Sequence, residues 1–286
     1  MPRALSYPVF LLAGLIVAVV ALRLLVPRIL PRFIYFPQRL AVDEADPDRW
    51  GLPEAEAVRI TASDGVTLHG WWLPAPSEER CGAAIYLHGN AGSIAGRGGI
   101  GREISDAALD VLFLDYRGYG ASAGSPSETG FYRDADAAWL HVREERGIAP
   151  DRIVLFGESM GGAVAVDLAT RRQVGALVLV APLPGTVPVA RALYPWVPDI
   201  VLDWIAERFD AMARVSGIEA PVLVAQGTAD RIIPPGLTRA LYDAAPEPKT
   251  WYPAEGFGHN DLYDDAGFWR AFRTFVRDAL ECRALP

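Results

Sequence analysis

Ser159 lies between glycines in the stretch LFGESMGG, residues 155–162, directly after a short apolar run. The run RIVLFG has the composition of a buried strand, and SMGGAVAVDLA has the apolar spacing of a helix. A G-x-S-x-G motif at such a strand-to-helix turn predicts a nucleophile elbow, which exposes the serine hydroxyl above a sheet. Gly157 and Gly161 suit this turn because small residues let the backbone bend sharply. The alternative is a serine that only caps a helix, so the rest of the chain must decide.

A serine hydroxyl is a weak nucleophile and needs a positioned base, which directs attention to the four histidines. His69 falls in a predicted hairpin, where we expect it on a strand face, and His141 falls in a charged helix, where we expect it to be solvated. His88 ends an apolar run and suits the shaping of a loop beside an oxyanion hole. His259 lies in EGFGHNDLY, between the last predicted strand and the C-terminal helix. It is the predicted base, and its alternative role is to cap that helix.

The base needs a carboxylate that fixes its tautomer and stabilises its charged form. Asp230, in VLVAQGTADRIIP, follows a predicted strand and is the candidate, with an Asx turn as its alternative role. Asp261 lies too near His259 in the chain and is expected to cap the following helix. The order Ser159, Asp230, His259 is the order expected when a nucleophile elbow opens a triad.

Further apolar runs recur through the chain and alternate with helical patterns. The strand-like runs are residues 83–88, 110–116, 152–157, 176–182, 221–227 and 250–256. Helical spacing is clearest over 131–146 and 159–172, and Asp64-Gly65 marks the turn of a hairpin. This alternation predicts an α/β fold with a mostly parallel twisted sheet and helices on both faces.

Composition excludes several other classes of function. The net charge of −8 gives no basic field for a phosphate backbone, so nucleic acid is not an expected partner. Lys249 is the only lysine, which removes most Schiff-base and Ser-Lys chemistries. Cys81 and Cys282 lack the spacing of a zinc site, and their positions do not decide whether they form a disulfide. Neither a dinucleotide-binding signature nor a metal-ligand cluster is visible, so no cofactor is expected.

Residues 8–26, PVFLLAGLIVAVVALRLLV, are apolar except for Arg23, and a helix of this length spans roughly 28 Å. They predict an N-terminal transmembrane anchor, which Pro27 and Pro31 would end. The alternative is a cleaved secretory signal after Arg3. Four arginines between positions 23 and 39 favour an outside N-terminus, and hence a cytoplasmic catalytic domain on a single-pass membrane protein.

The predicted domain organisation follows from these segments. We expect a membrane anchor over 1–32, a connector over 33–54 and a catalytic domain over 55–286. Residues 183–220 form an insertion between two strands and predict a small lid. The lid carries four aromatic side chains that could line an acyl pocket or pack on the sheet's helices: Tyr194, Trp196, Trp204 and Phe209.

Together these stretches resemble the α/β-hydrolases, specifically the small serine hydrolases with an N-terminal membrane anchor, some of them labelled prolyl-oligopeptidase-like. The stretches that carry the resemblance are FIYFPQR, YLHGNAGS, DYRGYGASAGSPSE, GESMGG, PVLVAQGTADRIIP and GFGHNDLY. One departure is Gln226, where similar proteins usually carry histidine. It lies beside the predicted acid and could tune hydrogen bonding there.

The resemblance implies an oxyanion hole made by the backbone amides of Met160 and Asn90, with Ala91 as the alternative to Asn90. The loop DYRGYG, residues 115–120, is expected to be mainly structural. The implied activity is hydrolysis of small or lipid esters or thioesters through an acyl-enzyme. A peptidase or amidase is the alternative, and a catalytically silent scaffold is a third. The sequence does not indicate an oligomeric state.

Overall fold

A computed structural model describes residues 6–29 and 34–282 of the chain. Its centre is an eight-stranded sheet with the order β10-β9-β8-β7-β4-β6-β3-β2. Neighbouring strands are parallel except where β3 pairs antiparallel with β2 and β6. The strands of this sheet are β2 (Glu56–Thr61), β3 (Thr67–Leu73), β4 (Gly82–Leu87), β6 (Leu109–Asp115), β7 (Ile153–Glu158), β8 (Ala176–Val180), β9 (Val222–Gly227) and β10 (Lys249–Ala254).

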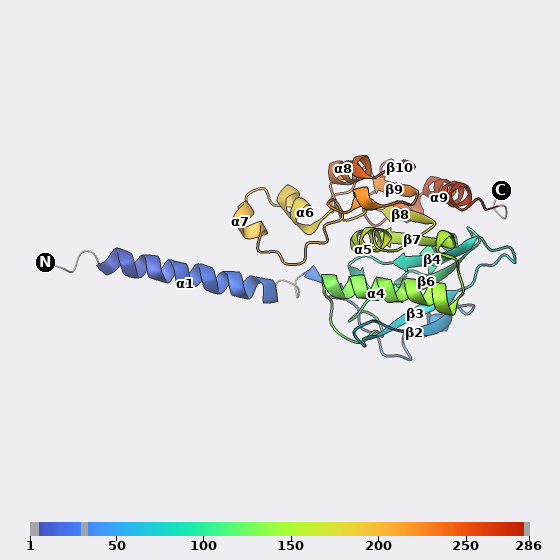
Figure 1. The fold of residues 1–286 in the computed structure, drawn as a ribbon, viewed down its shortest axis with the longest axis horizontal. Helices are drawn as coiled ribbons and strands as arrows, with labels where there is room; N and C mark the ends of the chain where they lie inside the picture. The colour runs from blue at the N-terminus through green and yellow to red at the C-terminus, as the bar shows by residue number, and fades with distance from the viewer. Residues whose placement is uncertain (1–5, 30–33, 283–286) are drawn as a thin grey trace.

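Helices cover both faces of this sheet (Figure 1). Alternate strand residues point to opposite cores: Ile85 and Leu87 belong to the core that includes α4, α5 and α8, whereas Tyr86 belongs to the core that includes α3 and α9. The expected α/β fold is therefore confirmed. The helices are α1 (Ser6–Ile29), α3 (Gly98–Ser105), α4 (Glu128–Leu140), α5 (Met160–Ala169), α6 (Thr186–Leu193), α7 (Asp199–Leu202), α8 (Pro235–Ala244) and α9 (Ala266–Ala279).

The helical pattern at 131–146 divides into two parts. It forms α4 up to Leu140, and residues His141–Glu145 form a short π-helical segment. His141 lies three and four residues after the buried Ala138 and Ala137, so its ring falls on the same inward face of the helix and is 5% exposed. Its Nδ1 lies 3.1 Å from the Glu145 carboxylate, and its Nε2 accepts a hydrogen bond from Arg146. The expectation that His141 is solvated is therefore wrong.

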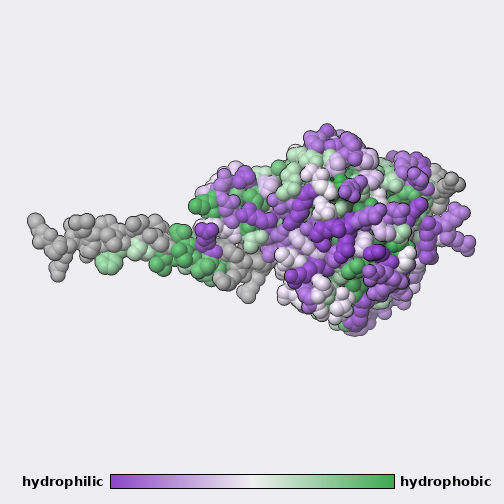
Figure 2. Space-filling model, in the orientation of Figure 1, coloured by the Kyte–Doolittle hydropathy of each residue, from purple (hydrophilic) through white to green (hydrophobic). Residues whose placement is uncertain are grey.

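The helix expected over 8–26 is present as the longer α1, which continues through Pro27 to Ile29. Pro27 therefore does not end it, since a missing N–H in the last turn costs at most one helical hydrogen bond; Pro31 lies outside the described residues. Within residues 6–29 and 34–282, no helix is long and apolar enough to cross a membrane. The structure thus does not support the transmembrane part of the prediction. Figure 2 shows the described surface of α1 as mostly hydrophobic, beside a body whose visible face is mostly hydrophilic.

The segment expected as a connector, 33–54, is packed against the body from its first described residues. Tyr35 and Leu52 are buried, and β1 (Phe36–Pro37) pairs in parallel with β5 (Ala91–Gly92) in a separate two-stranded sheet. The packed part of the protein therefore begins near residue 34, before the first strand of the large sheet.

A disulfide joins Cys81, just before β4, to Cys282, just after α9, across 201 residues of sequence. The two Cα atoms are 5.5 Å apart, within the usual range for a disulfide. The bond ties the C-terminal end of the described chain to the centre of the sheet. Closing so long a loop restricts the unfolded chain more than the folded one.

We expect the double variant Cys81→Ala/Cys282→Ala to lose about 2–4 kcal/mol of unfolding free energy. Guanidinium denaturation of both proteins measures this loss, and dithiothreitol should lower the midpoint of the parent but not that of the variant. Two titratable thiols in the untreated, denatured parent would contradict the prediction.

Candidate active site

Ser159 joins β7 to α5 in a strained backbone conformation, with φ 51° and ψ −116°. A non-glycine residue with positive φ costs free energy and persists only where its surroundings enforce it. Here the turn passes close to β4: a Cβ atom on Gly161 would lie 2.0 Å from the Leu87 carbonyl oxygen. A Cβ atom on Gly157 would lie 2.6 Å from the Gly161 carbonyl oxygen. Both glycines are required by these close approaches, which raise the serine above the sheet.

The structure brings the three residues of the predicted triad together. His259 Nε2 lies 3.0 Å from Ser159 Oγ, and His259 Nδ1 lies 2.7 Å from Asp230 Oδ2. An ionised carboxylate only accepts hydrogen bonds, so the ring proton belongs on Nδ1 and leaves Nε2 free to accept the serine proton. The three side chains come from the turn after β7 and the loops after β9 and β10, which meet at one edge of the sheet.

Asp230 combines both roles considered for it, one on each oxygen. Its Oδ1 accepts the amides of Ile232 and Ile233 in an Asx turn, and its Oδ2 faces His259. Burial opposes the charge on Asp230, but the hydrogen bond and charge of His259, with these two amides, hold its pKa below the usual range. Gln226 Nε2 also donates to Oδ2, at 2.9 Å. Gln226, the residue at which this sequence departs from similar proteins, therefore contacts Asp230 directly.

A cavity of about 440 Å³ opens beside Ser159 and His259, and the residues named for the oxyanion hole line it. Met160 is the first residue of α5, so its amide has no partner within the helix. Asn90 and Ala91 reach the cavity from the loop after β4. His88 lies beneath this loop, with Nδ1 2.7 Å from the Gly89 carbonyl oxygen. Burial and the charge of Arg97 lower the pKa of His88 to about 3, so this ring is neutral and shapes the loop.

Arg97 and Glu158 are site residues that the sequence did not reveal. Arg97 donates from Nη1 to the Ser93 carbonyl at 2.6 Å and from Nη2 to the Ala91 carbonyl at 2.8 Å. Its Nε lies 3.5 Å from Oε2 of Glu158, the residue directly before the nucleophile. Burial opposes the charge of Arg97, but Tyr86 and Glu158 keep its pKa above the usual range. The pair therefore connects the loop after β4 to the elbow.

One wall of the cavity is apolar. Its side chains come from the lid helix α6 and its surroundings: Leu183, Val189, Ala190, Leu193, Tyr194, Phe209, Ile232 and Ile233. Of the four lid aromatics, Tyr194 and Phe209 line the cavity, whereas Trp196 and Trp204 are not among its lining residues. α6 and α7 project from the body at the same end as α1 (Figure 1).

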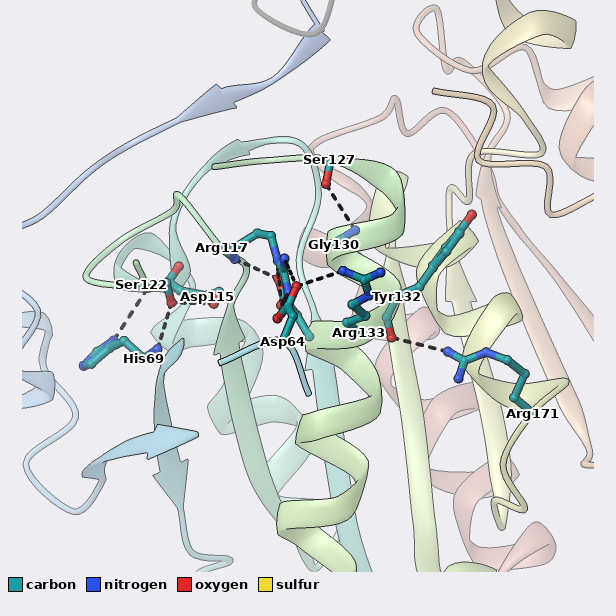
Figure 3. Close-up of polar contacts among 11 residues, drawn as sticks. Asp64, His69, Asp115, Arg117, Ser122, Ser127, Gly130, Tyr132, Arg133 and Arg171 are labelled. Atoms are coloured by element: carbon teal, nitrogen blue, oxygen red, sulfur yellow. Dashed lines mark hydrogen bonds and ion pairs between the residues drawn. The ribbon is translucent and has the colours of Figure 1, made fainter. Parts of the chain in front are cut away.

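The loop 115–120 makes mainly structural contacts. Figure 3 shows Arg117 beside Asp64, and the guanidinium also pairs with Asp134 at 2.7 Å. In the same view Ser122 accepts the His69 amide and donates to the Asp115 carbonyl.

Tyr119, in that loop, donates to Asn90 Oδ1 at 3.1 Å. This hydrogen bond joins the loop to the one that follows β4.

Asp261 does not cap the last helix, contrary to expectation. A short 3₁₀ helix, Leu262–Asp264, intervenes, so Asp265 caps α9 by accepting the amide of Gly267. Asp261 accepts the Gly258 amide instead, at 2.6 Å, and so braces the loop that carries His259. In the described part of the chain, no group of three or more His, Cys, Asp or Glu residues could hold a metal ion.

Comparison with known proteins relates this site to a family. Residues 78–210 match the Hydrolase_4 family, described as serine aminopeptidase, S33. The uncharacterized protein Rv2307c of Mycobacterium tuberculosis is 37% identical over 249 residues, which cover 86% of this chain and 87% of that protein. YfhR of Escherichia coli K12 is 33% identical over 84% of both chains.

Mouse alpha/beta hydrolase domain-containing protein 17C is 33% identical over 68% of this chain and 60% of its own length. Among solved structures, the Pyrococcus furiosus esterase Pf2001 superposes with a TM-score of 0.66 at 20% identity, over 86% of this chain and 99% of that one. The matched family and this structural neighbour agree that the chain has the α/β-hydrolase fold.

Proposed function

We propose that this protein is a serine hydrolase that cleaves carboxylic esters or thioesters through an acyl-enzyme. The observation that carries the proposal is the aligned hydrogen-bonding contact from Ser159 Oγ through His259 to Asp230, on a strained elbow beside an apolar cavity. A base within hydrogen-bond reach of the hydroxyl, itself oriented by a carboxylate, is what a serine needs in order to attack a carbonyl.

In the proposed mechanism His259 Nε2 takes the Ser159 proton while Oγ bonds to the substrate's carbonyl carbon. Negative charge then develops on the carbonyl oxygen and is stabilised by the amides of Met160 and Asn90, with Ala91 as the alternative to Asn90. The leaving group departs with the proton from His259. Water then attacks the acyl-enzyme by the same route and regenerates Ser159.

The cavity favours an ester with an apolar acyl group over a peptide. The family description, serine aminopeptidase, makes a peptidase the second candidate. An aminopeptidase needs a carboxylate free to bind the substrate's terminal ammonium. Among the described lining residues Glu158 is the only carboxylate, and it already pairs with Arg97 and accepts the hydroxyl of Tyr86. Hydrolysis of a peptide panel faster than of esters would favour the peptidase.

Lipid esters belong to the proposed substrate class because the lid wall of the cavity is apolar. Their hydrolysis does not require the protein to contact a membrane. Cytoplasmic placement of the catalytic domain stays a prediction of the arginine distribution. The disulfide between Cys81 and Cys282 weighs against it, because such bonds persist mainly in oxidising compartments.

We expect a fluorophosphonate probe to label the parent protein at Ser159 and to fail on Ser159→Ala and His259→Ala, because only an activated serine attacks phosphorus. Hydrolysis of p-nitrophenyl butyrate should fall by roughly 10³-fold or more in both variants. Ser122→Ala, which changes a buried serine away from the cavity, tests whether labelling is specific. A folded parent that resists the probe would rule out this mechanism.

For saturated p-nitrophenyl esters we expect kcat/KM to rise about three- to fourfold per methylene until the acyl chain fills the cavity. Ala190→Trp, which adds bulk to the lid wall, should shift the optimum to shorter chains. Arg191→Trp places the same side chain on an exposed position of α6 and should leave the optimum unchanged. An unaltered profile in Ala190→Trp would place the acyl chain elsewhere.

We expect Gln226→Leu to lower kcat about tenfold, since it removes a hydrogen bond to the charged oxygen that orients His259. Gln226→His keeps a donor at this position and should stay much closer to the parent. Steady-state kinetics on the same ester compare the two. Equal activity of the leucine variant and the parent would show that Asp230 is held without this donor.

A further inference from the structure

The loop after β4, residues 88–93, supplies one of the two proposed oxyanion donors but leaves the large sheet at Leu87. Regular strand pairing in the sheet therefore does not fix its geometry. Its end is held by the Ile94 amide, which donates to Asp115 Oδ1 at 2.9 Å. Arg97 holds it from the side of the cavity.

Its outer side lies against residues 34–40, which we call the strap. Within it, β1 pairs with β5 in the register Phe36↔Ala91 and Pro37↔Gly92. The amide of Gln38 donates to the Gly92 carbonyl at 2.9 Å. The strap therefore contacts the backbone next to both candidate donors, Asn90 and Ala91.

The strap also fixes the side chain of Asn90. Asn90 Nδ2 donates to the carbonyl of Ile34, and its Oδ1 accepts the hydroxyl of Tyr119. The carboxamide is thus held at both ends, which restricts the orientation of Asn90, a proposed oxyanion donor. Ile34 itself lines the cavity.

The strap is in turn anchored to the body, so it can act as a brace. Gly120 donates its amide to the Gln38 carbonyl at 2.8 Å and accepts the amide of Leu40 at 2.9 Å. Arg39 donates to the Gly124 carbonyl. Figure 1 shows this segment in blue, where the chain enters the body beside α4.

Tyr35 anchors the strap on its inner side. Its buried ring packs edge-on against Phe131 and Phe209, with ring centroids 5.2 and 6.3 Å away. Its hydroxyl donates to the carboxylate of Glu207, in the part of the lid that follows α7.

We propose that the strap is a positioning element of the active site: it holds the loop 88–93 so that its amide and that of Met160 meet the developing oxyanion. This inference rests on the proposed function. The catalytic unit then begins at residue 34 rather than at the first strand of the large sheet. Loosening the strap should weaken binding of the transition state more than binding of the substrate, because preorganised donors act on charge that appears only in the transition state.

The test compares Gln38→Pro with Gln38→Ala in the full chain. Proline lacks the N–H that bonds Gly92 and follows a residue that is already proline. Alanine keeps this N–H and removes an exposed side chain, together with the long hydrogen bond, 3.4 Å, that its Oε1 accepts from Ser93 Oγ. We expect kcat for p-nitrophenyl butyrate to fall about ten- to hundredfold in the proline variant, with KM within about twofold. The alanine variant should match the parent.

A trifluoromethyl ketone gives a readout that a merely structural role would not move. Ser159 Oγ adds to its carbonyl carbon, the proton passes to His259, and the resulting oxyanion occupies the hole. Its affinity should weaken in Gln38→Pro by the same factor as kcat/KM, with circular dichroism and melting temperature unchanged. A folded Gln38→Pro variant as active as Gln38→Ala would overturn the inference.

If Gln38→Pro does not fold, Asn90→Leu decides the matter. Leucine is similar in shape and adds no charge beside the oxyanion, but it makes neither of the two hydrogen bonds that hold the Asn90 carboxamide, and the same loss of kcat and of ketone affinity is expected. Parent-like kinetics in this variant would overturn the inference. An inactive, unlabelled parent would overturn the proposed function itself, whereas an active parent beside equally active variants would overturn the strap alone.

Discussion

The close contact between the nucleophile turn and β4 is the constraint on which the rest of the site depends. Gly161 lies against the carbonyl of Leu87, the last residue of β4, so the elbow and the start of the loop 88–93 cannot move independently. The same contact helps to hold Ser159 in its strained backbone conformation. One donor of the proposed oxyanion hole is the first amide of α5, and the other lies in the loop after β4. The distance between the two donors therefore depends on this contact.

Ion pairs and hydrogen bonds to charged groups stabilise the elbow and the loops that surround it. Glu158, the last residue of β7, directly precedes the nucleophile, in a place where an unpaired carboxylate would be costly. Arg97 compensates it and donates to two carbonyls of the loop 88–93, so one ion pair joins the two sides of the cavity. On the other side of the serine, the negative charge of Asp230 is stabilised by hydrogen bonds from His259, Gln226 and two backbone amides. The site is thus built from charges that are already compensated before a substrate enters.

The parts that the sequence predicted are those with a local signature. Buried parallel strands are continuous apolar runs, so the sheet could be predicted. The elbow is marked by glycines at fixed spacing, and Ser159, Asp230 and His259 follow predicted strands in the expected order. The role of Arg97 has no such signature. It donates to backbone carbonyl groups, which every residue has, so no sequence pattern marks its partners. The pairing of Phe36 with Ala91 likewise joins two-residue strands far apart in the chain, too short for any periodicity. The burial of His141 was not expected because the charged residues around it hide that it continues the inward face formed by Ala137 and Ala138.

The strap also links the loop 88–93 to the lid, since Ile34 bonds Asn90 and the hydroxyl of the next residue, Tyr35, bonds Glu207. Glu207 accepts the amide of Glu128 as well, and Glu128 accepts the amide of Arg208, so the base of the lid is latched to the start of α4 by two reciprocal carboxylates. A lid held this way cannot swing from its base without disturbing Tyr35. Movement of the whole lid to admit a substrate would therefore disturb the loop 88–93. This favours entry by local motion of α6, whose apolar side chains line the cavity.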